Sequence, residues 1–362
     1  FRKTIEKDIR QLSGAERKLT DKKTSLFIKH PDKEIEEYKK NSIKKICRII
    51  VHLGDNVRFY PLRGKTNNGK FVHIFDRETF RTIFSELDTI PDFIEYLEKK
   101  EEAFNNTFAV VLPKDEYDFD SMTADQFKEY SFLNSIDDVQ KYVLISGTEF
   151  DLLAHYLVNN RQMPGHLISQ KYGWLFLQID GAWADFQKRK EVILKRDQDK
   201  ISYFVDDFVR NELFKSPNEM RIKIARELLS FSRFDRRIIS KSFFSFYNEN
   251  KDKGTNAVSR RYWTQNEIGF AFVLFPPHWN DITINSILDL AVQSFCIYDK
   301  YKAKKIILIA NRFDLQQFRF GMIENIIPFD KETEDLIMED VKKLGWFTNI
   351  NYSTGIESEY PG

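Results

Sequence analysis

The spacing of apolar residues changes along the chain and separates helical segments from extended ones. Near the start, Ile5 and Ile9 begin an apolar stripe at helical spacing among charged residues, which predicts an amphipathic helix. A second helix is predicted over residues 33–50. Residues 57–62 and 71–75 are short apolar runs joined by a polar, glycine-bearing connection, and this pattern predicts a β-hairpin.

The middle of the chain combines helix caps with short apolar strands. Thr89 and Thr148 each precede a helical pattern, and a hydroxyl at this position accepts a hydrogen bond from the first helical turn. Strands are predicted at residues 108–112 and 143–145. Continuous apolar runs of this kind usually lie inside a sheet whose two faces are covered. Residues 182–247 have a mostly helical pattern.

The last third of the chain alternates strands with helices. We predict a strand at residues 268–275, a helix at 284–298, a strand at 305–310 and a helix at 331–344. This alternation indicates an α/β layer with a partly parallel sheet. The predicted fold class is therefore α/β, with a mixed sheet and flanking helices, a helical connector and a smaller C-terminal α/β unit.

We divide the sequence into four parts on these patterns. They are an N-terminal basic helical segment (residues 1–40), a mixed α/β domain (41–180), a helical connector (181–250) and a smaller C-terminal α/β unit (251–362). The chain has 362 residues, of which 42% are hydrophobic and 31% charged. Such a composition excludes disorder and a membrane-embedded protein.

Cysteine content and the lack of targeting signals indicate the cytoplasm. Cys47 and Cys296 are too few to form a disulfide framework or a zinc site by themselves. Apolar runs such as residues 270–276 are far shorter than the roughly 20 residues that span a bilayer. No signal peptide is evident. We therefore expect a cytoplasmic protein that does not associate with membranes.

Complete cofactor and metal motifs are missing from the sequence. The chain contains neither the glycine pattern of dinucleotide-binding folds nor the serine motif of α/β-hydrolases. Its six histidines show no metal-ligand spacing. We identify no cofactor and no metal site, and Mg²⁺ enters only under the nuclease hypothesis below.

Five residues are candidates for catalysis. Asp76 and Glu78 close one predicted strand, and Glu149 and Asp151 follow another. Metal-dependent nucleases use such carboxylates to hold a divalent cation beside an activated water. The alternative is that they stabilise the positive ends of helices. His73 lies within a strand close to Asp76 in sequence, so it is a candidate general base, with a structural or surface role as the alternative.

Charge is unevenly distributed along a chain whose net charge is only +1. Residues 1–50 carry 15 Lys or Arg against 8 Asp or Glu, and residues 221–261 carry 11 against 4. The second region interleaves arginine with aromatic residues, which suits phosphate contacts and base stacking. Acidic residues 101–151 and 322–362 are alternative partners for it, within the chain or between copies. The candidate residues for binding nucleic acid or a partner are Arg226, Arg233, Arg236, Arg237, Lys241, Arg260 and Arg261.

Part of the sequence resembles a family of uncharacterised bacterial proteins. The resemblance rests on residues 71–76, which read FVHIFD, and on residues 85–101, which read SELDTIPDFIEYLEKKE. Residues 149–157 and 225–227 are similar to later parts of the same pattern. The resemblance implies a bacterial, cytoplasmic protein, but the family has no settled activity, so no catalytic residue carries over. Such stand-alone proteins often belong to anti-phage defence or mobile-element systems, which is an argument by association.

Three functional hypotheses follow. The first is a defence-type protein that engages nucleic acid, or a nucleic-acid-bound partner, through the basic and aromatic region. The second is a non-catalytic assembly or scaffold subunit that pairs through its segregated acidic and basic surfaces, either with a protein partner or with further copies of itself. The third is a divergent metal-dependent nuclease, which is the first choice if the protein is an enzyme.

Overall fold

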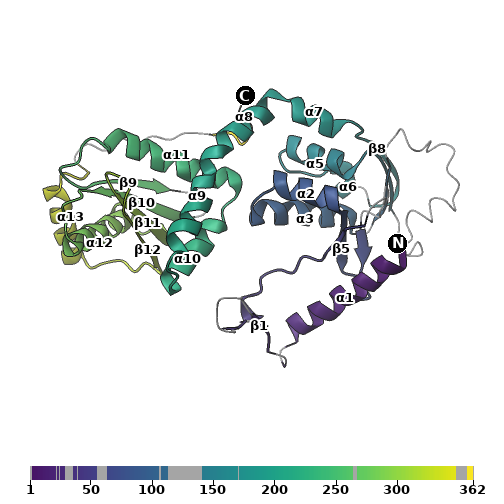
Figure 1. The fold of residues 1–362 in the computed structure, drawn as a ribbon, viewed down its shortest axis with the longest axis horizontal. Coiled ribbons are helices and arrows are strands. Elements are labelled where there is room, and N and C mark those ends of the chain that lie inside the picture. The colour runs from purple at the N-terminus through teal and green to yellow at the C-terminus, as the bar shows by residue number, and fades with distance from the viewer. Residues whose placement is uncertain are drawn as a thin grey trace. The chain divides into compact units, whose positions relative to one another are not determined.

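The protein forms two compact units, residues 1–189 and residues 190–362, and each is described by itself (Figure 1). The structure is a computed structural model. It describes residues 2–21, 23, 25–28, 36–38, 40–54, 63–105, 107–112, 141–169, 171–263, 267–347 and 357–361. The strand predicted at residues 57–62 lies outside these described residues.

The N-terminal unit contains three small sheets and their helices. Its helices are α1 (Arg2–Thr20), α2 (Arg77–Glu86), α3 (Ile90–Phe104), α5 (Glu149–Val158), α6 (Gly165–Ser169) and α7 (Ala182–Lys188), with a 3₁₀ turn at Lys40–Ser42. Its strands are β1 (Phe27–Ile28), β2 (Glu36–Glu37), β3 (Ile49–His52), β4 (Arg63–Lys65), β5 (Phe71–Asp76), β6 (Thr107–Leu112), β7 (Lys141–Ser146) and β8 (Gly173–Gln178). The sheet orders are β1-β2, β3-β5-β4 and the all-parallel β6-β7-β8.

Helix α1 packs against one face of the β3-β5-β4 sheet. Ile5 and Ile9 of α1 form a buried cluster with Ile50 of β3 and with Val72 and Ile74 of β5. Their spacing explains the contact, because residues four apart share one helix face and residues two apart share one strand face. The apolar stripe predicted from the sequence is therefore the face by which α1 is attached.

One predicted helix of this unit is wrong. Residues 33–50 were expected to be helical, yet Ile49–His52 forms strand β3, parallel to β5. A run of β-branched residues favours a strand once a neighbouring strand offers backbone partners. Strands β4 and β5 pair antiparallel around a turn at residues 66–70, where Gly69 adopts a φ of 73°. Strand β4 occupies residues that the sequence placed in the connection of a hairpin, while the predicted first strand at residues 57–62 lies outside the described residues.

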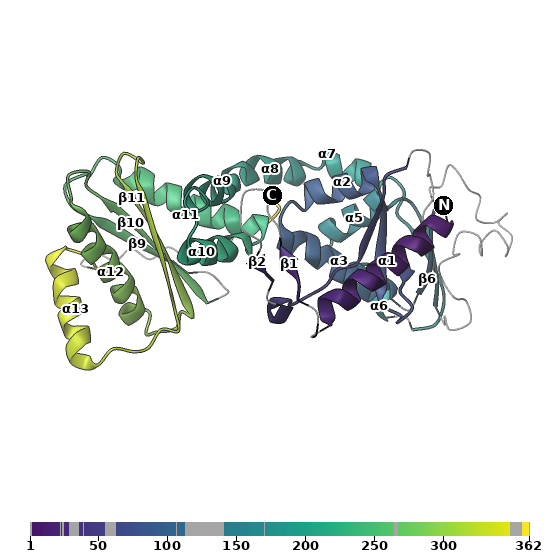
Figure 2. The ribbon, with the colours of Figure 1, turned by 60° about the horizontal axis from the view of Figure 1, so that its bottom comes forward.

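The C-terminal unit is a four-stranded sheet between two layers of helices (Figure 2). Its helices are α8 (Lys190–Asp199), α9 (Tyr203–Phe208), α10 (Glu219–Leu229), α11 (Arg233–Asn250), α12 (Asp281–Tyr298) and α13 (Lys331–Lys343), with a 3₁₀ turn at Lys200–Ser202 and a π turn at Val209–Leu213. Its strands are β9 (Val258–Trp263), β10 (Ile268–Phe275), β11 (Lys305–Arg312) and β12 (Phe318–Glu324), in the order β12-β11-β10-β9.

Strand β10 shows why this unit has two apolar layers. Phe270 and Phe272 pack with α9, α10 and α11, whereas Ala271 and Val273 pack with α12 and α13. Both faces of the strand are thus covered, which accounts for its continuous apolar run. The predicted β10-α12-β11 unit is confirmed, because β10 and β11 pair parallel. Helices α9 to α11, assigned to a connector from the sequence, share a core with this sheet.

The fold class predicted from the sequence is confirmed: the protein is mixed α/β, with sheets flanked by helices. Strand β12 is a missed element, since the sequence indicated a loop between β11 and α13. Phe318, Phe320 and Met322 alternate with Arg319 and Gly321 and pack against the core, a period-two pattern that the prediction missed. Among the described residues, no helix has both the length and the apolar character to cross a membrane.

Candidate functional site

The candidate base His73 lies inside the N-terminal unit. It sits in the middle of β5 and only 2% of its surface is exposed. Its ring stacks near those of Phe71 and Phe75, with centroids 4.8 and 6.2 Å away. Burial, together with the positive charge of Lys100, lowers the pKa of His73 well below its usual range. His73 is therefore a neutral core residue that no substrate in solution reaches.

Asp76 and Glu78 belong to the first turn of α2. Asp76 caps this helix, and its carboxylate accepts hydrogen bonds from the backbone N–H of Thr79 at 2.7 Å and from the Thr79 hydroxyl at 3.1 Å. Glu78 points into solvent two residues later. Both positions match the capping and dipole roles that carboxylates play at helix N-termini.

Glu149 forms a buried ion pair with a lysine that the sequence analysis did not single out. Its Oε1 accepts hydrogen bonds from Lys100 Nζ and from the Tyr96 hydroxyl, each at 2.7 Å. Lys100 has no exposed surface and lies 4.5 Å from the ring centroid of Phe75. Burial lowers the pKa of Lys100. Because both charges are closed off from solvent, the pair holds α3 against α5 and offers no reactive atom to an outside molecule.

Asp151 is the acidic member of a capping box at the start of α5. Its Oδ2 accepts from the backbone N–H of Thr148 at 2.8 Å, and its own N–H donates to the Thr148 hydroxyl at 3.3 Å. Its Oδ1 accepts from the N–H of Trp183 at 2.9 Å. In the part of the chain that the structure describes, no group of three His, Cys, Asp or Glu side chains is placed to hold a metal ion.

Arg233 and Arg236 of α11 are buried and share one carboxylate. NH1 of Arg233 lies 2.7 Å from Oδ2 of Asp206, and NH1 of Arg236 lies 2.6 Å from Oδ1. Arg236 also donates to the backbone oxygens of Leu229 at 2.7 Å and Phe231 at 3.0 Å. These two cations are neutralised within the fold.

Arg237 and Lys241 lie about one and two turns after Arg233 on α11, and each has an acidic partner. NH1 of Arg237, which has no exposed surface, lies 3.1 Å from Oδ1 of Asp199. Nζ of Lys241 lies 2.7 Å from Oε2 of Glu357 and 3.1 Å from Oε1 of Gln198. Both cations are thus held by acceptors on other segments of the C-terminal unit.

The remaining three basic candidates differ from one another. NH2 of Arg260 lies 2.5 Å from Oε2 of Glu249. The guanidinium of Arg261 lies 3.7 Å from the ring centroid of Tyr298, and burial lowers the pKa of Arg261. Arg226 is exposed and has no ion pair with any residue that the structure describes.

The open arginine surface expected from residues 221–261 is therefore not formed. Of its seven candidates, Arg226 alone is exposed and without an ion pair to a described residue. The physical reason is that Asp199 and Asp206, from helices that precede this stretch, pack against α11 and supply the counter-charges. A charge count within one stretch of sequence does not include such partners.

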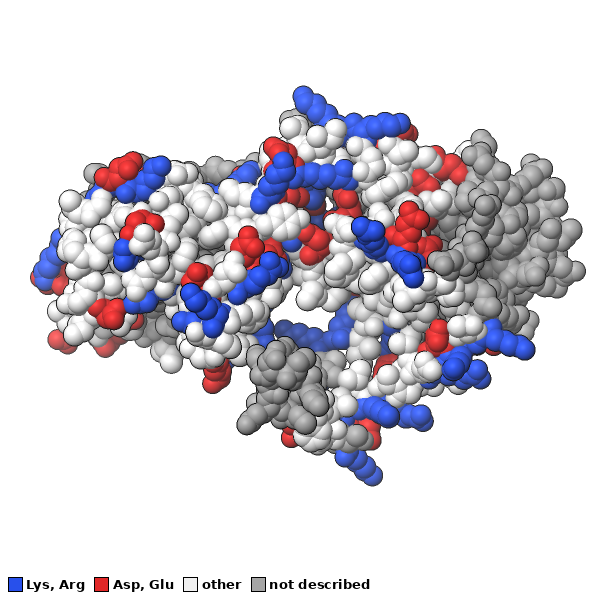
Figure 3. Space-filling model, viewed as in Figure 1, with Lys and Arg blue, Asp and Glu red and all other residues white. Residues whose placement is uncertain are grey.

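Exposed positive charge gathers instead on helix α1. Five of its Lys and Arg side chains are exposed and form no ion pair with a described residue. Figure 3 shows Lys and Arg side chains along the surface that α1 forms, at the lower right. We call these five residues the α1 basic face: Lys3, Lys7, Arg10, Arg17 and Lys18. The sequence contained the signal, since the stripe begun by Ile5 and Ile9 identifies the opposite face as exposed.

Glu16 anchors the C-terminal half of α1 to the rest of the unit. Its two carboxylate oxygens accept from Arg48 at 2.6 and 2.7 Å, and Oε1 also lies 2.5 Å from Lys70 Nζ. The hydrogen-bonded Arg48 guanidinium, assisted by Lys70, lowers the pKa of Glu16 from 4.5 to about 2. The helix that carries the α1 basic face is thus fixed by an ion pair on its inner side.

We expect this anchor to make the protein sensitive to acid. A carboxyl group whose pKa falls on folding stabilises the native state above its unfolded pKa of 4.5, and the contribution is lost as pH falls towards about 2. The Glu16→Gln variant lacks this carboxyl group and should not show the dependence. The unaltered chain should therefore lose about 2–3 kcal/mol of its stability advantage over the variant between pH 4.5 and pH 2. Urea denaturation at a series of pH values measures it.

Glu102→Gln is the matched control, because Glu102 forms only an exposed pair with Lys99. The free energy of unfolding of this variant should fall with pH in the same way as that of the unaltered chain. A Glu16→Gln protein that loses as much stability at acid pH as the unaltered chain would contradict the assigned role of the anchor.

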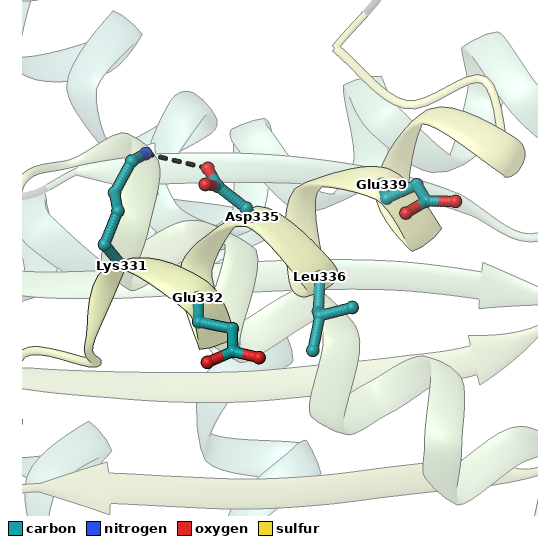
Figure 4. Close-up of a pocket in the computed structure, with 5 residues that line it drawn as sticks. All are labelled: Lys331, Glu332, Asp335, Leu336 and Glu339. Atoms are coloured by element: carbon teal, nitrogen blue, oxygen red, sulfur yellow. Dashed lines mark hydrogen bonds and ion pairs between the residues drawn. The ribbon is translucent and has the colours of Figure 1, made fainter.

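Helix α13 of the C-terminal unit carries a shallow surface hollow of about 510 Å³ (Figure 4). Its lining residues all come from this one helix: Lys331, Glu332, Asp335, Leu336 and Glu339. Lys331 Nζ lies 2.7 Å from Oδ1 of Asp335, and the Leu336 side chain is exposed between carboxylates. This face is acidic with one apolar residue, and among the residues that the structure describes no second element lines the hollow.

The fold and these contacts define a mixed α/β protein whose helix α1 carries five exposed cations without ion pairs to described residues. No protein-family model matches the chain, and the searches of curated proteins and of solved structures found no significant match either. Function is therefore argued from the chain's own residues.

Proposed function

We propose that this protein binds nucleic acid through its phosphate backbone, with the α1 basic face as the contact surface. The observation that carries the proposal is the exposure of Lys3, Lys7, Arg10, Arg17 and Lys18 without ion pairs to described residues. Unpaired cations attract phosphates and release the counterions condensed on nucleic acid. The nucleic-acid hypothesis of the sequence analysis is kept, but its contact surface moves from α11 to α1.

The geometry of a helix gives this surface a defined reach. With a rise of about 1.5 Å per residue, the distance along the axis from Lys3 to Arg17 is roughly 21 Å. Charge on duplex DNA recurs about every 1.7 Å of helix axis, so a row of this length lies beside several phosphates at once. Contacts of this type carry no base-specific information, and the proposed binding is independent of sequence.

The attachment of α1 favours nucleic acid over a membrane surface. Amphipathic helices that bind lipid bury their apolar face in the interface. In α1 that face is already occupied, since Ile5 and Ile9 pack against Ile50, Val72 and Ile74. A helix that offers only its basic side suits a hydrated polyanion. Because it is held rigidly, little conformational freedom is lost on binding.

The test is the salt dependence of binding to a labelled duplex of arbitrary sequence. Five phosphate contacts predict a slope of about −4.5 for the logarithm of the binding constant against the logarithm of salt concentration. In Lys7→Gln/Arg10→Gln, the slope should become shallower by about 2, and affinity near 0.1 M salt should fall by roughly tenfold per contact removed. Fluorescence anisotropy measures both quantities.

Lys171→Gln/Lys188→Gln is the control, because it removes the same charge from exposed positions of the N-terminal unit outside α1. It should bind almost as well as the unaltered chain. Equal losses in the two variants, or no binding by the unaltered chain, would reject the proposal.

A second candidate function is self-assembly, in which the α1 basic face of one copy meets the acidic face of α13 on another. The carboxylates Glu332, Asp335 and Glu339 on one exposed helix face favour it, because an acidic surface attracts the basic surface of another copy. Oligomers at low salt that dissociate at high salt, without nucleic-acid binding, would support this candidate. A bacterial origin, the cytoplasm and a role in anti-phage defence stay predictions of the sequence.

A further inference from the structure

Residues 357–361 lie along α8 and α11 in the C-terminal unit, with their backbone held by Arg237. NH2 of Arg237 donates to the backbone oxygens of Ser358 at 2.7 Å and Glu359 at 3.2 Å. NH1 of the same guanidinium donates to Oδ1 of Asp199 at 3.1 Å and to the backbone oxygen of Glu359 at 3.2 Å. The fully buried guanidinium of Arg237 thus binds two successive peptide carbonyls of residues 357–361.

The side chains of this segment meet two lysines. Lys241 Nζ lies 2.7 Å from Oε2 of Glu357, and Lys195 Nζ lies 3.7 Å from Oε1 of Glu359. Lys195 Nζ also lies 5.7 Å from the ring centroid of Tyr360. Lys195 Nζ also lies 2.6 Å from Oδ2 of Asp199, so its contact with Glu359 is the longer of its two ion pairs. The two carboxylates and the aromatic ring of the segment each lie near a lysine, and this arrangement selects side chains as well as backbone.

The contacts that hold the segment are polar. Glu357 and Ser358 are exposed, Glu359 and Tyr360 are half-buried, and none of them belongs to a hydrophobic core of the unit. Ion pairs of exposed side chains contribute little net stability, and ordering a segment costs conformational entropy. A segment bound in this way exchanges with a competing ligand more readily than one anchored by apolar residues.

We propose that Lys195, Arg237 and Lys241 form a binding site for an acidic peptide, which residues 357–361 occupy as an internal competitor. The outside ligand is a partner-protein segment with the pattern Glu-x-Glu-Tyr. Arg237 recognises its backbone, Lys241 its first carboxylate, and Lys195 its second carboxylate and aromatic ring. The residues involved differ from the α1 basic face, so this inference stands independently of the proposed nucleic-acid binding.

The experiment uses a fluorescent peptide of sequence Glu-Ser-Glu-Tyr-Pro and the full chain. In the unaltered chain, residues 357–361 compete with the peptide for the site. The apparent affinity for the peptide is therefore reduced in proportion to the fraction of molecules whose site is open. Glu357→Lys/Glu359→Lys should release the segment, because both lysine pairs become repulsive. This variant should bind the peptide at least about tenfold more tightly than the unaltered chain. A peptide with glutamine in place of both glutamates should bind about tenfold more weakly.

Glu332→Lys/Glu339→Lys is the matched control, since it makes the same charge change on the exposed face of α13. Its peptide binding should equal that of the unaltered chain. Lys241→Glu in the released variant should remove binding, and Lys241 is exposed enough for the fold to tolerate the change. Circular dichroism establishes that each variant is folded.

Two results would overturn the inference. One is equal peptide affinity for the released variant and the unaltered chain. The other concerns competition: an oligonucleotide of equal charge displaces the labelled peptide at the same concentration as the unlabelled peptide does. The site would then respond to negative charge alone.

Discussion

Replacing Lys100 with methionine should lower the free energy of unfolding by about 3–5 kcal/mol, because it leaves a buried carboxylate without its cation. Glu149 loses the Nζ partner that lies 2.7 Å away and keeps only the Tyr96 hydroxyl. Its second oxygen already has no hydrogen-bond partner in the part of the chain that the structure describes. Urea denaturation at neutral pH measures this loss.

Lys99→Met is the matched control for this prediction. Lys99 is the preceding residue of α3 and pairs with Glu102 at 3.3 Å near the surface, so its removal should change stability by less than about 1 kcal/mol. The double variant Lys100→Met/Glu149→Gln should recover much of the loss, because both buried charges are then absent. A Lys100→Met protein as stable as Lys99→Met would show that the pair is not buried as described.

Asp206→Ala should lower the free energy of unfolding by a similar amount, about 3 kcal/mol or more, because one carboxylate neutralises two buried arginines. Arg233 and Arg236 lie 2.7 and 2.6 Å from its two oxygens. After the substitution, Arg233 retains the Ser202 hydroxyl at 3.1 Å and Arg236 retains backbone carbonyls, but both lose the carboxylate that they share. Thermal and urea unfolding of the variant test this expectation.

Asp207→Ala provides the comparison at the neighbouring position. Asp207 forms an exposed pair with Arg210 at 3.7 Å, so its loss should cost less than about 1 kcal/mol. The Asp206→Ala variant also separates stability from binding. If Arg233 and Arg236 contacted nucleic acid, freeing them should strengthen binding, whereas the proposed α1 surface predicts no change in a variant that stays folded.

Local sequence signals predicted the helix caps well. Thr89 and Thr148 cap α3 and α5, as the hydroxyl before each helical pattern indicated. Strand β10 occupies residues 268–275 as predicted, because a run of eight buried apolar residues has few other solutions. These features depend on residues only a few positions apart in the chain, so they can be read from the sequence itself.

Features that depend on distant partners were predicted poorly. The pattern over Ile49–His52 suited a helix or a strand, and pairing with β5 decided it. Asp151 and Asp76 were as compatible with metal binding as with capping until the positions of Thr148 and Thr79 were known. The sequence alone could not distinguish a metal ligand from a helix cap, because a carboxylate near the start of a helix is compatible with both roles.

The sequence by itself determined that the protein is mixed α/β, where most of its helices and strands lie, and that α1 has one apolar and one basic side. Only the tertiary structure decided which cations remain available to a ligand. Arg233, Arg236 and Arg237 meet Asp199 and Asp206 across packed helices, while the α1 basic face meets no described carboxylate. The reason is that electrostatic pairing depends on distance in space, which the order of residues along a chain does not specify.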